Sequence, residues 1–142
     1  MLDGDEFVRW RSEAGRALES ARVQAAAGLH NWACFAAEQA AQLAVKALLH
    51  GMGRAPWGHD LVRLGESLRD AVKQGWPTEL DVRVRRLSRH YIPARYPDAH
   101  PSGSPAAHYG PQEAEEAIAD AETLLAAVDA AWSLLGGRKA DG

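Results

Sequence analysis

Residues 29–50, LHNWACFAAEQAAQLAVKALLH, constrain the fold of this chain more than any other stretch. They are apolar on nearly every face of a helix and rich in alanine, and their main polar residues are Glu38, Gln39, Gln42 and Lys46. A helix that is apolar on most faces is buried on most faces, and alanine lets neighbouring helices approach closely. We therefore expect a central helix with other helices packed around it.

The polar residues of this helix lie close to one another. Glu38 and Gln42 are direct i,i+4 neighbours, and Lys46 lies on nearly the same side two turns from Glu38. They form a small polar seam, which lies either between helices or against a dimer partner. The alternative is that Glu38 is the carboxylate of a catalytic site. We prefer the seam, because structural carboxylates outnumber functional ones.

Apolar residues at three- and four-residue steps predict four further helices. Asp3 or Asp5 caps the first and Asp60 the third, Pro77 and Pro111 open the fourth and the last, and Gly28, Gly75 and Gly136 mark ends. The inner face of the fourth is expected to run from Leu80 to Tyr91.

The expected fold class is all-α, because no segment shows sustained period-two alternation. We predict an antiparallel up-and-down bundle of four long helices plus a short one, with a long ordered loop before the last helix. One domain is expected over residues 1–136, followed by a flexible tail at 137–142.

Composition excludes several classes of protein. No run of 18 apolar residues is present, so no membrane span is expected. The first residues lack the apolar core of a secretory signal, and the single cysteine, Cys34, offers no internal disulfide, so a cytoplasmic protein is expected. The six histidines show no metal-ligand spacing, and no phosphate-binding glycine loop is present, so neither a metal nor a cofactor is predicted.

Residues 82–100, VRVRRLSRHYIPARYPDAH, carry five arginines, two histidines and two tyrosines, with Asp98 as the only acid. The whole chain has a net charge of −3, so any anion binding must be local. Pro93 and Pro97 fix the backbone where the charge is densest. This composition is typical of a phosphate or nucleotide site. The alternative is an arginine-rich solvated helix followed by a structural loop.

Four parts of the sequence carry a resemblance to a known family: WACFAAEQAAQLAVKALL, then GHDLVRL, then RHYIPARYPDAHPSGSP, and a tyrosine before an acidic last helix. Together they resemble the HEPN family of small helical domains over residues 5–135. The resemblance implies a homodimer that works with a minimal nucleotidyltransferase, in many cases as a toxin–antitoxin pair. Some HEPN domains are metal-independent ribonucleases with an Arg, four to six residues, then a His. Others bind only nucleotides or their partner.

Two pairs in this sequence match the ribonuclease spacing. The first is Arg95 and His100, which lie in the loop, where nothing prevents them from converging. The second is Arg85 and His90, but a continuous helix would turn these two side chains apart. The second choice is therefore Arg86 and His90, which lie closer in sequence and share a helical face at i,i+4.

The leading functional hypothesis is phosphate binding by the loop, for a nucleotide or RNA. The expected ligand-binding residues are Arg83, Arg86, Tyr91, Arg95, Tyr96 and Asp98. The first alternative is cleavage, in which a His moves the proton and an Arg stabilises the phosphate charge. It is weakened because Tyr96 stands where the ribonucleases commonly have a polar residue. The second alternative is a dimeric adaptor in which Arg95 pairs inward with an acid such as Glu38.

Overall fold

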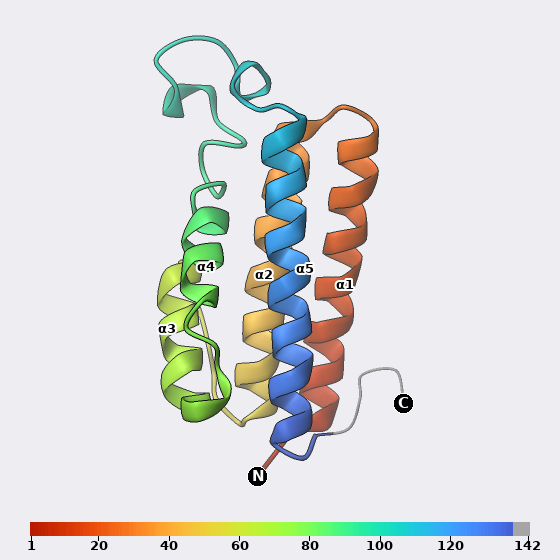
Figure 1. Cartoon of the computed structure of the whole chain (residues 1–142), viewed down its shortest axis with the longest axis vertical. Helices are drawn as coiled ribbons and strands as arrows, with labels where there is room; N and C mark the ends of the chain where they lie inside the picture. Colours follow the sequence, from red (N-terminus) through yellow and green to blue (C-terminus); the bar gives the residue numbers. More distant parts are fainter. Residues whose placement is uncertain (138–142) are drawn as a thin grey trace.

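The computed structural model describes residues 1–137, which contain helices and loops but no strand (Figure 1). The all-α bundle expected from the sequence is confirmed, and α4 is its short helix. The predicted tail at 137–142 lies, except for Gly137, outside the described residues. The α-helices are α1 (Gly4–Ala26), α2 (His30–Gly51), α3 (Leu61–Val72), α4 (Leu80–Ser88) and α5 (Pro111–Leu134). No helix in the described part of the chain is long and apolar enough to cross a membrane.

The centre of the bundle is α2, as its apolar sequence predicts. It contacts each of the other four α-helices, and α1, α2 and α5 run side by side while α3 and α4 cover another side of α2 (Figure 1). Helix axes come close because alanines such as Ala37, Ala40 and Ala44 are fully buried in the contacts. At the end of α2, Gly51 faces the ring of Trp132, which stacks on Phe7 with ring centroids 4.3 Å apart.

Most predicted helix ends are confirmed. Asp3 Oδ1 accepts a hydrogen bond from the backbone N–H of Glu6 at 3.1 Å, and Asp60 caps α3 in the same way. Gly28, with φ +81°, follows the end of α1 in the left-handed conformation that glycine adopts without strain. Pro111 is the first residue of α5, where its missing N–H costs no helical hydrogen bond.

Three predicted boundaries are wrong. Helix α3 ends at Val72, and a 3₁₀ turn, Lys73–Gly75, continues the chain to the glycine that was expected to end the helix. Helix α4 does not start at Pro77, whose carbonyl closes a turn with the N–H of Leu80. Nor does it reach Tyr91, since the N–H groups of residues 89–91 bond to carbonyls three residues back.

The segment 89–110 links α4 to α5 and passes over the end of the bundle where α1 turns into α2 (Figure 1). It contains two 3₁₀ helices, Pro97–Ala99 and Pro105–His108. Two small residues, Ala94 and Pro105, are buried and attach the segment to the bundle. The loop is therefore an ordered part of the fold, as its side chains suggested.

Candidate phosphate-binding site

The guanidinium of Arg95 lies among three aromatic rings. Its central carbon is 4.3 Å from the ring centroid of Phe35, 4.6 Å from that of Tyr91 and 4.9 Å from that of Tyr96. Its Nε donates a hydrogen bond to the carbonyl of Tyr91 at 2.8 Å. We call Phe35, Tyr91, Arg95 and Tyr96 the Arg95 cluster. Since cation–π contacts and a hydrogen bond both act on one guanidinium, its plane is fixed.

Local backbone bonds place Arg95 in the cluster. The N–H groups of Arg95 and Tyr96 both donate to the carbonyl of Ile92, at 3.0 and 3.2 Å, which closes a tight turn around Pro93. The buried amide of Asn31, on α2, donates to the carbonyl of Ala94 at 3.0 Å. The turn is therefore tied to α2 directly before the arginine.

A buried carboxylate lies next to the cluster. Glu38 is 0% exposed, and its two oxygens accept hydrogen bonds from the amides of Gln42 at 2.6 Å and Gln39 at 2.9 Å. Burial raises its pKa from 4.5 to about 7, while the two amides and the charges of Arg95 and Lys46 act in the opposite direction. The predicted polar seam on α2 is thus present, and its acid responds electrostatically to Arg95.

His59 connects this seam to the cluster. The Gln42 amide also donates to the carbonyl of His59 at 3.0 Å, and the His59 ring stacks on Tyr91 with centroids 5.7 Å apart. Asp60, the residue after His59, caps α3, as predicted from the sequence.

His100 points to a different set of contacts from those of Arg95. Its Nε2 lies 2.7 Å from the carbonyl of Pro93, so this nitrogen carries the hydrogen, because a carbonyl only accepts. Its ring stacks on that of His108, with centroids 4.2 Å apart and planes 5° apart. Within residues 1–137, no hydrogen bond or ring contact joins Arg95 to His100, and Asp98 is exposed without a hydrogen bond to Arg95.

Two arginines of α4, Arg83 and Arg86, are bound to an acid of α5. Asp120 is 1% exposed, and both of its oxygens accept from Arg86, at 2.6 and 2.9 Å, while one also accepts from Arg83 at 2.8 Å. These hydrogen bonds raise the pKa of Arg86. Arg83 and Arg86 therefore serve the contact between α4 and α5, where Asp120, and Glu116 at 3.9 Å from Arg86, offset part of their charge.

The second predicted pair does not form a unit either. His90 lies beyond the end of α4, and its Nδ1 is 3.0 Å from the hydroxyl of Tyr109. Burial lowers the pKa of His90, which favours the neutral ring, and raises that of Tyr109 to about 12. Arg85 is exposed, in agreement with a solvated role.

Neither the cysteine nor the acids and histidines of the described residues form a second candidate site. Cys34 is fully buried, and burial raises its pKa to about 12, so it is a core residue. In residues 1–137, no group of three or more His, Cys, Asp or Glu side chains is arranged to hold a metal ion.

Sequence reasoning missed Phe35 and His59 as members of the site. Phe35 lies one turn before Glu38 on α2, so helical spacing alone places them on neighbouring positions of one face. Nothing in the local sequence indicates that the turn after α4 brings Arg95 onto that face.

Comparisons with known proteins agree with this architecture. The model of the HEPN domain family matches residues 7–131. The structure of TT1696 from Thermus thermophilus is similar, with 42% identity, a TM-score of 0.80, and coverage of 84% of this chain and 93% of that one. No protein of curated function matches the chain.

Two further solved structures are similar. ST0689, an archaeal HEPN homologue, is 32% identical with a TM-score of 0.71, over 86% of this chain and 93% of that one. An HEPN domain protein of Thermotoga maritima, tm0613, is 32% identical with a TM-score of 0.69, over 90% and 98% of the two chains. The chain belongs to the HEPN domain family.

Proposed function

We propose that this HEPN domain binds the phosphates of a nucleotide or of RNA at the Arg95 cluster. We also propose that it acts as a homodimer with a minimal nucleotidyltransferase partner, in a toxin–antitoxin pair. Support for the dimer and the partner comes from the family resemblance. Light scattering on the purified chain tests the dimer, and co-purification with a co-expressed nucleotidyltransferase tests the partner.

The observation that carries the phosphate site is the state of the Arg95 guanidinium. Its Nε is bound to the carbonyl of Tyr91, and within residues 1–137 neither Nη has a hydrogen-bond or ion-pair partner. Two parallel N–H donors on a fixed plane match the oxygens of a phosphate. Because the aromatic rings already restrict the side chain, little further rotamer freedom is lost on binding.

Exposed rings around the arginine favour a nucleotide or RNA over a bare phosphate. Tyr96 is 47% exposed, and Trp32, which meets Phe35 edge to face, is 43% exposed. Bases stack on aromatic side chains without regard to sequence, at about 1–3 kcal/mol per base. Phosphate contact at Arg95 with stacking on such rings is the usual combination of a single-strand binding surface.

Replacement of Arg95 by alanine tests this proposal. We expect the affinity for a fluorescein-labelled single-stranded RNA, measured by fluorescence anisotropy, to fall by about tenfold or more, because a charge-assisted phosphate contact is lost. Arg85→Ala is the matched control, since Arg85 is exposed on α4 and lies outside the cluster. Equal affinities of wild type and Arg95→Ala would refute the phosphate site, as would an equal loss in the control.

The contacts of His100 favour binding over cleavage. Its Nε2 is engaged by the carbonyl of Pro93, and its ring is not in contact with Arg95 in the described structure. The ribonuclease alternative predicts RNA cleavage in the presence of EDTA that His100→Ala abolishes. That result would replace the binding proposal, whereas intact RNA after incubation with folded wild type supports it.

A further inference from the structure

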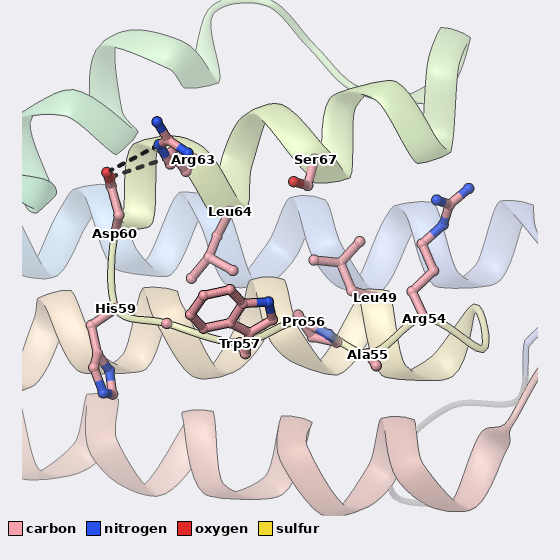
Figure 2. A pocket seen from close by; sticks show the side chains of 11 residues that line it. Leu49, Arg54, Ala55, Pro56, Trp57, His59, Asp60, Arg63, Leu64 and Ser67 are labelled. Atoms are coloured by element: carbon pink, nitrogen blue, oxygen red, sulfur yellow. Dashed lines mark hydrogen bonds and ion pairs between the residues drawn. The ribbon is translucent and has the colours of Figure 1, made fainter.

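A groove separate from the Arg95 cluster lies between the end of α2, the connecting segment 52–60 and α3. Its cavity volume is about 470 Å³, within the range of small-ligand sites. Figure 2 shows its apolar middle, formed by Leu49, Leu64 and the indole of Trp57. No role in the proposed phosphate binding accounts for it.

Trp57 is the most unusual residue of this groove. Its side chain is 88% exposed, although a large aromatic ring normally gains about 2 kcal/mol or more from burial. The two leucines beside it, Leu49 and Leu64, are 2% and 5% exposed and form the floor of the groove. The exposed indole of Trp57 forms one of its sides. A flat apolar group placed between floor and wall would cover both.

The charges at the two ends of the groove differ. At one end, Arg63 lies 3.9 Å from Asp60, so its charge is partly offset (Figure 2). At the other end stands Arg54, which is exposed and has no ion-pair partner within residues 1–137. A ligand that fills the apolar middle and reaches Arg54 would therefore gain from a negative charge at that end.

We propose that this groove binds a planar apolar group that carries a carboxylate, with the ring between Trp57 and the two leucines and the carboxylate on Arg54. This chemistry has two sources: a free aromatic acid, or an aromatic residue at the carboxyl terminus of a protein chain. The groove is distinct from the Arg95 cluster but touches it, since His59 lines the groove and stacks on Tyr91.

The test is a titration of the full chain followed by two-dimensional ¹H–¹⁵N NMR. The probe is 2-naphthoate, and 2-naphthalenemethanol is its uncharged counterpart. We expect naphthoate to shift the Trp57 indole N–H and the amides of Gly58 and Ser67, with a Kd on the order of 1 mM. The alcohol is expected to bind about tenfold more weakly.

Variants assign the two contacts. Arg54→Gln should weaken naphthoate binding by about tenfold without changing the affinity for the alcohol, and Trp57→Ala should weaken both. Both side chains are exposed, so neither change should affect folding. Arg16→Gln, an exposed position on α1, is the control. Equal binding of acid and alcohol, or unchanged binding by Arg54→Gln, would overturn the assignment.

A tetrapeptide, acetyl-Gly-Gly-Gly-Phe, and its C-terminal amide separate the two sources. Tighter binding of the free peptide acid than of naphthoate supports a chain terminus as the ligand, and the reverse order supports a free aromatic acid. If neither acid shifts resonances of the groove, the proposal is wrong. RNA binding at Arg95 is measured separately, so a failure of one proposal leaves the other standing.

Discussion

At the scale of single residues, two charged groups of opposite sign define the site. Arg95 is fixed by three rings and one carbonyl, and Glu38 is buried beside it with two amide donors. A buried carboxylate without an ion pair is stable only if it is hydrogen-bonded or neutral. Glu38 meets both conditions: two amides donate hydrogen bonds to it, and its pKa of about 7 leaves it partly protonated near neutral pH.

Glu38 should make the stability of the domain depend on pH. Its pKa is higher in the folded chain, at about 7, than its ordinary 4.5, so the folded state holds the proton more tightly. The resulting stabilisation is fully present below about pH 4.5 and is lost as the pH rises through about 7, with a total of about 3 kcal/mol. Urea denaturation at several pH values between about 4 and 8 measures it.

The variant Glu38→Gln isolates this contribution. Burial lowers the pKa of His90, so the contribution of His90 to stability is lost as the pH falls, opposite to that of Glu38. The informative quantity is therefore the difference in the free energy of unfolding between wild type and Glu38→Gln. We expect that difference to shift in favour of the variant as the pH rises through about 7. Parallel curves for wild type and Glu38→Gln would show that Glu38 does not titrate in this range.

The sequence made Arg95 a candidate because it lies in a basic, aromatic and proline-bounded stretch. It named Arg86 as a ligand-binding residue as well, since both belong to the same charged run. The distinction arises from Asp120 on α5, which binds Arg86, and from Phe35 on α2, which receives Arg95. These are contacts between distant parts of the chain, and residue spacing does not encode them.

At the scale of elements, the segment 89–110 positions the site. It leaves α4 through a 3₁₀-like turn and is held to α2 by the amide of Asn31, which bonds to the carbonyl of Ala94. The prolines predicted an irregular segment correctly. They did not predict that helix α4 stops at Ser88, because the apolar spacing continues to Tyr91 while the hydrogen bonds change from four-residue to three-residue steps.

Asn31→Ala should loosen this segment without unfolding the bundle. The change leaves the carbonyl of Ala94 without its buried donor, at a cost of about 1–3 kcal/mol. We expect amide hydrogen exchange at Arg95 and Tyr96, which both bond to the carbonyl of Ile92, to accelerate by about tenfold or more.

Gln24→Ala is the control for this change, since the side chain of Gln24 bonds to Ser20 on the surface of α1. It should leave exchange in the segment 89–110 unchanged. Unaltered protection of Arg95 and Tyr96 in Asn31→Ala would show that other contacts hold the turn.

At the scale of the whole molecule, the bundle is built on close contact between α1, α2 and α5. Apolar periodicity was sufficient to predict all five helices and the central place of α2, because burial on most faces leaves only one arrangement for such a helix. The same periodicity does not report how near the helices come. That distance depends on pairs such as Gly51 on α2 and Trp132 on α5, because the indole occupies the space that a side chain on residue 51 would need.

Gly51→Ala should destabilise the fold. The new Cβ would lie 2.6 Å from the Trp132 ring and 3.1 Å from Phe7, and overpacking of this kind costs about 1–3 kcal/mol. Gly15→Ala, within α1, is the matched control: its Cβ would meet only the end of the Arg11 side chain, at 3.4 Å. Thermal denaturation should show a loss for the first and a gain of up to about 1 kcal/mol for the second.

If Arg95 itself contacts phosphate, the Nε–H resonance of its side chain must respond to the ligand. The hydrogen bond to the Tyr91 carbonyl slows exchange of this proton, which makes the signal observable by ¹H–¹⁵N NMR. During titration with single-stranded RNA, we predict a saturable shift of the Arg95 signal and none for the Nε–H of Arg11, which is hydrogen-bonded to Asp129 on another side of the bundle. Binding that reaches saturation while the Arg95 signal stays in place would contradict the account.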